Sequence, residues 1–261
     1  MLKELKQLSV FDRIVYLDTN HSYKIDGKPS AKVSVTGLVG SVKHPFETDK
    51  WAAIKAKEFD STPEEVKLVW KKNNELSTFQ GSTLHAYIDN YYSNKIIPYN
   101  KNVAESILGP VLHNKMRENL AKLVLQFNQF YNDTKEQILP IKREFVIGDI
   151  DGVRVCGMLD MLSYNPQKNV FEIYDFKTNK DFNYTTKFNK KYNEPLSHLD
   201  DCEFSAYSLQ LSLYKYIIEK YTDIRIADLY VVWFSINNET YQLIPLNYLE
   251  DEVKVLLNTL T

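Results

Sequence analysis

The chain has 261 residues, of which 44% are hydrophobic, so it can bury the core of one large domain or two small ones. Its formal net charge of −2 neither requires nor excludes a polyanionic partner, and any surface for nucleic acid must therefore be local. Its two cysteines are too few for a disulfide framework, a four-cysteine zinc site or an iron–sulfur cluster ligated within one chain.

The first part of the chain, residues 1–136, is predicted to be a hairpin followed by helices. Apolar and polar residues alternate from Arg13 to Ile25 and lead into Asp26-Gly27, a dipeptide typical of a tight turn. Thr62 supplies a capping hydroxyl and is followed by a proline and two acids, which predicts a helix start. The expected helices cover Phe46–Glu58, a segment from Thr62, Phe79–Tyr92 and about Pro110–Asp133.

The second part, residues 137–261, is predicted to hold the sheet. Short runs of Ile, Val, Phe and Tyr predict three consecutive strands in a meander, over Ile141–Ile147, Val153–Tyr164 and Val170–Phe176. The elements expected to follow are a helix over about Cys202–Tyr221, strands over about Ile226–Phe234 and Tyr241–Pro245, and a short helix. We therefore expect a single α/β domain with a mixed central β-sheet of four or five strands flanked by helices.

Three polar residues on the predicted strands fit phosphodiester chemistry. Side chains alternate along a strand, so Asp175 and Lys177 share one face, and Asp160 on the preceding strand can reach the same ion. In such a site carboxylates hold a divalent ion and the lysine stabilises the charge that develops on the phosphate. An Asp-x-Lys triplet is weak evidence alone, because Asp26-Gly27-Lys28 and Asp133-Thr134-Lys135 also match and an exposed ion pair explains most such triplets.

Two pairs of residues on predicted helices add to this site. His85 and Asp89 are four residues apart on one helix face, and an imidazole can join carboxylates around Mn²⁺ or Mg²⁺. Gln210 and Tyr214 are also four residues apart, and an amide and a phenol can contact phosphate or position the lysine. Packing is the competing explanation for both pairs, since a helical histidine beside an apolar stripe is more often a core residue.

In chain order, these motifs resemble a known nuclease family. Gly-Ser-x-x-His-x-x-x-Asp at 81–89, Gly-x-x-Asp at 157–160, Asp-Phe-Lys-Thr at 175–178 and Gln-x-x-x-Tyr at 210–214 resemble the RecB-like branch of the PD-(D/E)XK nuclease superfamily, especially its compact phage-type exonucleases. The resemblance covers about half of the chain and is looser over residues 23–36. It implies a restriction-endonuclease-like core and hydrolysis of DNA with a divalent metal.

The resemblance also implies a role for each matching residue. The expected ligands of the catalytic Mg²⁺ or Mn²⁺ are His85, Asp160, Asp175 and the backbone carbonyl of Phe176. The expected catalytic residues are Asp160, Asp175, Lys177, Gln210 and Tyr214, with Asp89 in a supporting role. Asp175 stands where the family more often has Glu, and the iron–sulfur cysteines of some relatives are absent, so no cluster is expected.

Further candidates are less specific. Glu144 on the first predicted strand is a supporting acid in this scheme, although a Lys-Arg-Glu triple on an exposed strand needs no special explanation. The stretch after the third strand interleaves lysines with aromatic residues, so it either follows a DNA backbone and stacks on bases or forms a solvated loop. Its expected DNA-binding residues are Lys180, Lys187, Lys190 and Lys191, and its aromatic residues are Phe182, Tyr184, Phe188 and Tyr192.

The sequence thus predicts a DNA nuclease, with exonuclease action on single strands or DNA ends as first choice. By resemblance, its role would be in phage recombination or repair. One alternative is a structure-specific or non-specific endonuclease. A second is a catalytically inactive DNA-binding module with the same fold, and a third is a helical interaction protein. No run approaches the roughly 18 apolar residues of a membrane span and the first ten residues do not resemble a signal peptide, so we expect a cytoplasmic protein, in the bacterial host cytosol if the chain is phage-derived.

Overall fold

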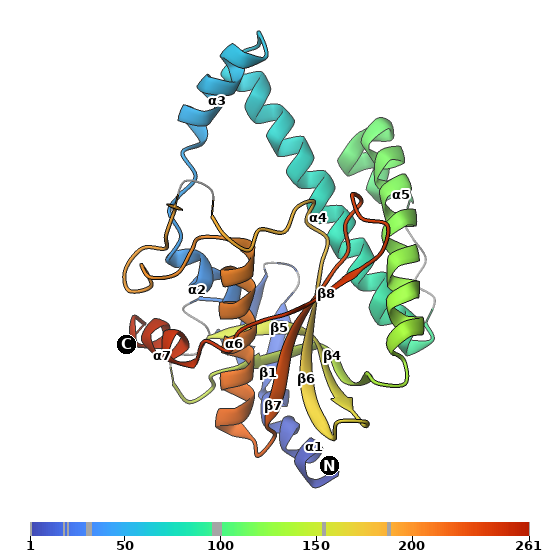
Figure 1. The fold of residues 1–261 in the computed structure, drawn as a ribbon, viewed down its shortest axis with the longest axis vertical. Coiled ribbons are helices and arrows are strands. Elements are labelled where there is room, and N and C mark those ends of the chain that lie inside the picture. The colour runs from blue at the N-terminus through green and yellow to red at the C-terminus, as the bar shows by residue number, and fades with distance from the viewer. Residues whose placement is uncertain are drawn as a thin grey trace.

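A computed structural model describes residues 2–17, 19, 21–29, 33–95, 101–152, 155–186 and 189–260. Its architecture is mixed α/β, with a five-stranded mixed sheet covered by helices on both faces and a separate three-stranded sheet (Figure 1). Among the helices of these residues, none combines the length and apolar character that a membrane crossing requires.

The central sheet has the strand order β4-β5-β6-β7-β8. Its strands are β4 (Leu139–Gly148), β5 (Cys156–Asn165), β6 (Val170–Lys177), β7 (Ile226–Trp233) and β8 (Gln242–Pro245). The first three strands form the predicted antiparallel meander, β7 pairs in parallel with β6, and β8 returns antiparallel to β7. Helix α6 (Glu203–Tyr221) makes the crossover that parallel neighbours require, so β6 and β7 end at the same edge of the sheet.

Each face of the sheet has its own core. Helices α6 and α2 (Val35–Ser41) lie on one face, where Leu213 belongs to the same buried cluster as Ile173 of β6. Helices α4 (Pro63–Ser93) and α5 (Lys101–Thr134) cover the other face, where Leu84 and Phe127 join Tyr174 and Phe176. Alternate residues of β6 therefore enter different cores, as the strand period of two predicts.

Two predicted helices are in fact one. The capping box at Thr62 is present, with its hydroxyl accepting from the Glu65 N–H and the Glu65 carboxylate accepting from the Thr62 N–H. The helix that starts there does not stop before Phe79 but runs for 31 residues as α4. Gly81 does not break it, because glycine inside a helix weakens the helix by only about 1 kcal/mol and tertiary packing offsets that cost.

The N-terminal region and α5 also depart from the predicted pattern. The hairpin of β1 (Ile14–Leu17) and β2 (Ser22–Ile25) is present, and the Asp26-Gly27 turn leads on to a third short strand, β3 (Lys28–Pro29). Helix α5 contains a break at Gly109, with φ 73° and ψ 164°, so Pro110 begins its second segment as predicted. The remaining elements are α1 (Leu2–Gln7), a 3-10 helix (Leu8–Arg13), α3 (Thr48–Glu58) and α7 (Glu250–Asn258).

Candidate metal centre and active site

The predicted acids meet where β5 and β6 separate. The backbone pairing of β5 with β6 ends at Met161 and Tyr174. The next pair in this register would be Asp160 and Asp175. Beyond that point the N–H of Phe176 donates to Asp160 Oδ2 at 2.7 Å rather than to the β5 backbone. The Asp160 side chain therefore fills the gap between the strands and is held there by the end of β6.

A histidine and two carboxylates from three different elements form a group that could hold a cation. One potential ligand atom each from His85 on α4, Glu144 on β4 and Asp160 on β5 lies within 4.8 Å of the others. His85 Nδ1 is 3.6 Å from Asp160 Oδ1 and 3.7 Å from Glu144 Oε1. Adjacent ligands of an octahedral Mg²⁺ are about 3 Å apart, so small side-chain rotations suffice for these donors to share an ion.

The other His85 nitrogen contacts the expected carbonyl ligand. His85 Nε2 lies 2.9 Å from the Phe176 carbonyl oxygen, which links α4 to the end of β6. Burial lowers the pKa of His85, but the carboxylates of Asp160 and Glu144 outweigh it and raise the pKa to about 9. Without a cation, the imidazole is therefore protonated at neutral pH and offsets the charge of the two acids.

Glu144 belongs to this group and has a strained backbone. Its φ is 43°, and the register of β4 with β5 passes from Arg143 to Phe145 without pairing it. A left-handed residue other than glycine inside a strand costs of order 1–3 kcal/mol, and such residues concentrate at functional sites. The strain supports a direct role for Glu144, which the sequence could identify only as a supporting acid.

Asp175, which is buried, and Lys177, which is partly buried, form an ion pair beside this group. Lys177 Nζ is 2.5 Å from Asp175 Oδ2, and the Gln210 amide donates to Asp175 Oδ1 at 3.3 Å. Burial raises the pKa of Asp175 to about 6, against the opposing charge of Lys177 and with the help of Asp160. Burial lowers the pKa of Lys177, but both carboxylates outweigh it and raise the pKa above its ordinary value. Asp175 thus faces the lysine and α6, and it lies outside the group of His85, Glu144 and Asp160.

Tyr207 contacts Lys177 but was not among the predicted site residues. Lys177 Nζ lies 5.0 Å from the centre of the Tyr207 ring, and the Tyr207 hydroxyl donates to Asn179 Oδ1. A cation over an aromatic face is held by the ring quadrupole. The signal for Tyr207 was its position one turn before Gln210 on the same helix, which places it on the face that carries the predicted motif.

Tyr214 and Asp89 support the site without joining the metal group. The Tyr214 hydroxyl donates to the Met158 carbonyl at 2.9 Å, so Tyr214 fixes β5 two residues before Asp160. Asp89 accepts from Arg143 Nε at 2.9 Å and thereby ties α4 to the strand that carries Glu144. Tyr214 and Asp89 are therefore positioning residues. They hold in place the separate elements that carry the two carboxylates and the histidine.

Gly157→Ala is expected to destabilise the protein by about 2 kcal/mol or more, because overpacking of a filled core is costly. A Cβ at Gly157 would lie 2.7 Å from Tyr214 Cε1 and 3.0 Å from Val35 Cγ2, so α2 or α6 would have to shift. Urea unfolding followed by circular dichroism measures the loss. Gly40→Ala is the matched control, since a Cβ there meets no atom within 4 Å.

The predicted DNA-binding stretch is only partly available to a ligand. Lys190 and Lys191 form ion pairs with Asp201 and Asp200, at 2.9 Å and 2.6 Å, so their charges are partly offset. Lys180 is exposed, and Lys187 and Phe188 lie outside the described residues. The proposed base stacking is wrong for two of the aromatic residues, Phe182 and Tyr192, because tertiary packing buries both. Tyr184, at 54% exposure, remains available.

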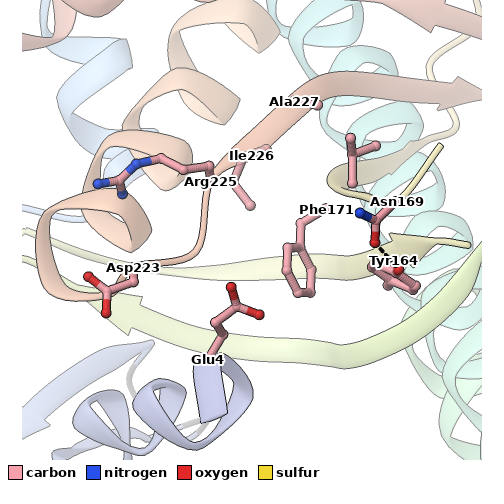
Figure 2. Close-up of a pocket in the computed structure, with 9 residues that line it drawn as sticks. Glu4, Tyr164, Asn169, Phe171, Asp223, Arg225, Ile226 and Ala227 are labelled. Carbon is pink, nitrogen blue, oxygen red and sulfur yellow. Dashed lines mark hydrogen bonds between the residues drawn. The ribbon is translucent and has the colours of Figure 1, made fainter. Parts of the chain in front are cut away.

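A separate pocket of about 430 Å³ lies at the opposite end of β6 and β7 (Figure 2). Figure 2 shows Glu4, Asp223 and Arg225 on one side and the rings of Tyr164 and Phe171 on the other. None of the described site residues lines this pocket. Since both strands run from the pocket towards Asp175 and Lys177, the pocket and the acidic site are separated by the length of β6.

Comparison with known proteins leaves the site to be judged on its own geometry. No protein-family model and no curated protein matches the sequence. The arrangement unites a histidine, three carboxylates and a lysine from α4, β4, β5 and β6 at one edge of the sheet. Chemically, it can bind a divalent cation and can place a positive charge beside an anionic substrate.

Proposed function

We propose that the chain is a metal-dependent DNA nuclease of the PD-(D/E)XK superfamily, with its central sheet and flanking helices as a restriction-endonuclease-like core. The observation that carries the proposal is the meeting of His85, Asp160, Asp175 and Lys177 beside the point where β5 and β6 separate. His85 on α4 is far along the chain from the consecutive strands that carry Asp160, Asp175 and Lys177. Packing alone does not favour a largely buried ion pair beside two further acids, because charges removed from water are costly unless they are paired.

The donor set fits Mg²⁺ or Mn²⁺. His85, Glu144 and Asp160 would hold the ion, with the Phe176 carbonyl beside them and Asp175 next to Asp160. A divalent ion bound there would polarise the scissile phosphate and lower the pKa of an attacking water molecule. Only oxygen and imidazole donors are present in the group, which suits these cations better than thiolate-preferring metals.

The protein's own groups supply positioning and positive charge. Lys177 is held by Asp175 and by the Tyr207 ring, so its ammonium can stabilise charge that develops on a phosphate without first being ordered. Gln210 fixes Asp175 from α6, and Tyr214 fixes β5. We propose exonuclease action in the cytoplasm, in phage recombination or repair, with endonuclease action as the alternative mode.

Degradation of end-labelled DNA is expected to require Mg²⁺ or Mn²⁺ and to stop when EDTA removes the ion. A time course on single-stranded, double-stranded and circular DNA measures this, with Asp175→Asn as the inactive variant. Asp228→Asn is the matched control, because Asp228 is a half-exposed acid on β7 that pairs with Lys168 away from the site.

Survival of circles would identify an exonuclease, and cleavage of circles would identify an endonuclease. Equal cleavage by wild type and by Asp175→Asn would show that the cleavage does not depend on Asp175 and would contradict its place in the active site. No cleavage by folded protein would contradict the proposed function.

A further inference from the structure

The alternation of side chains along β4 is interrupted at Glu144. In a regular strand, residues two apart point to the same face of the sheet, so Arg143 and Phe145 would share a face. Instead, the Arg143 guanidinium contacts α4, whereas Phe145 belongs to the buried cluster on the face covered by α6 and α2. Glu144 lies between them with a φ of 43°, so its left-handed backbone is the point at which β4 changes faces.

Strand β5 is interrupted at the facing position. The two neighbours of Glu144 pair with Met161 and Leu159. Glu144 therefore lies across from Asp160. Met161 belongs to the cluster under α4 and α5, whereas Leu159, two residues away, belongs to the cluster under α6 and α2. Both strands thus change faces at the two acids of the metal group.

The interruption brings the Glu144 carboxylate to the side of α4. In a regular β4, Glu144 would point to the face opposite Arg143 and so away from the helix that carries His85. Instead, Glu144 Oε1 lies 3.7 Å from His85 Nδ1. A left-handed conformation is unfavourable for a glutamate and persists only where the surrounding contacts enforce it.

Arg143 makes the contacts that can enforce this conformation. Its Nε donates to Asp89 Oδ1 at 2.9 Å, and its Nη2 donates to Ser93 Oγ at 2.6 Å. Its guanidinium also lies 5.7 Å from the centre of the Tyr92 ring. All three partners belong to the last two turns of α4, so the residue before Glu144 is fixed to the helix that carries His85.

We propose that Arg143 is a positioning residue that holds Glu144 in its left-handed conformation and thereby sets the affinity of the metal group for a divalent cation. Arg143 is anchored on α4 and Phe145 is buried on the other face, so Glu144 has to connect two residues that point in opposite directions. A guanidinium suits this role because its planar fork reaches Asp89 and Ser93 at once. The inference rests on the proposed function, because it concerns the same metal site.

A double-mutant cycle on Mn²⁺ affinity, measured by calorimetry, tests whether Arg143 acts through Glu144. In the wild-type background, Arg143→Met is expected to weaken Mn²⁺ binding about tenfold, because the Glu144 carboxylate is no longer held beside His85. In the Glu144→Gln background, the same change should alter the affinity by less than about twofold. Arg13→Met is the matched control, because Arg13 pairs with Asp26 through the same two nitrogens, at 3.0 Å and 2.5 Å, outside the metal group.

The conformation of Glu144 can also be followed without a metal ion. Its ¹³Cα resonance in the labelled full-length protein depends on its backbone φ and ψ, so Arg143→Met should shift this resonance and Arg13→Met should not. Asp89→Asn combined with Ser93→Ala removes the partners of Arg143 from the side of α4 and should reproduce both effects. The test therefore does not depend on the folding of a single variant.

Two results would overturn the positioning role of Arg143. Equal weakening of Mn²⁺ binding in both backgrounds would show that Arg143 acts on the fold as a whole and not through Glu144. An unchanged Glu144 resonance in the folded variants would show that the contacts with α4 do not hold its conformation. Absence of Mn²⁺ binding by the folded wild-type protein would instead contradict the proposed function, and the resonance would still decide whether Arg143 holds Glu144.

Discussion

Lys177→Met is expected to lower the rate of DNA cleavage by about 100- to 1000-fold, the typical effect of removing one preorganised electrostatic group. The ammonium is held between Asp175 at 2.5 Å and the Tyr207 ring at 5.0 Å, so it is ordered before substrate arrives. Divalent-ion affinity should stay similar or increase, because Lys177 is a cation and removing it makes the site more negative. Single-turnover cleavage and calorimetric titration with Mn²⁺ measure the two effects, and Lys135→Met, an exposed lysine after α5, is the control.

The same variant should lose stability in a pH-dependent way. Removing Lys177 leaves the buried Asp175 carboxylate without its cation, which costs about 3 kcal/mol when the acid is ionised. With Lys177 present, burial raises the pKa of Asp175 to about 6 from 3.8 although the lysine lowers it, so without the lysine this pKa lies higher still and the folded variant keeps the neutral acid to a higher pH. The penalty is therefore small near pH 5 and grows as pH rises towards 8, which urea unfolding at the two pH values measures. Unchanged stability at both pH values, together with near-wild-type cleavage, would contradict the roles of Lys177 in catalysis and in neutralising Asp175.

The local parts of this site could be predicted because they follow from secondary structure. Strand alternation places Asp175 and Lys177 on one face, and the sequence pattern identified β4, β5, β6, α6, β7 and β8. The helix start at Thr62 was also correct, because a capping box is a local signal. The continuity of α4 through Gly81 was not, since tertiary packing decides whether a glycine ends a helix.

The assembled site depends on contacts that no local pattern encodes. Asp160 reaches His85 because β5 and β6 separate, and Glu144 reaches both with a backbone conformation that is rare in strands. Motif order indicated that His85 and Asp160 belong together, whereas the sequence gave Glu144 only as a supporting acid and did not identify Tyr207. In the loop before α6, the burial of Phe182 and Tyr192 depends on distant residues, so composition alone overestimated the surface available to DNA.

Binding of Mn²⁺ is expected to strengthen about tenfold per pH unit from near pH 6.5 to near pH 8.5, because the ion must displace one proton. The pKa of His85 in the ion-free protein is about 9, so the imidazole is protonated throughout this range. A ligating imidazole must be neutral, and each unit of rising pH lowers proton competition tenfold until the pKa is reached. Calorimetry in buffers of different ionisation enthalpy measures both the affinity and the protons released.

Asp160→Asn tests whether the metal ion binds at the same cluster of side chains from which the His85 proton is displaced. The amide oxygen can still accept from the Phe176 N–H, so the end of β6 keeps its hydrogen bond. Loss of the carboxylate removes a proposed metal ligand and one of the charges that raise the pKa of His85, so affinity should fall by about 100-fold and the pH dependence should weaken. Asp228→Asn should keep both wild-type values. If His85→Gln retained wild-type affinity and pH dependence, the histidine would be a packing residue, and the metal site would have to be built from the carboxylates alone.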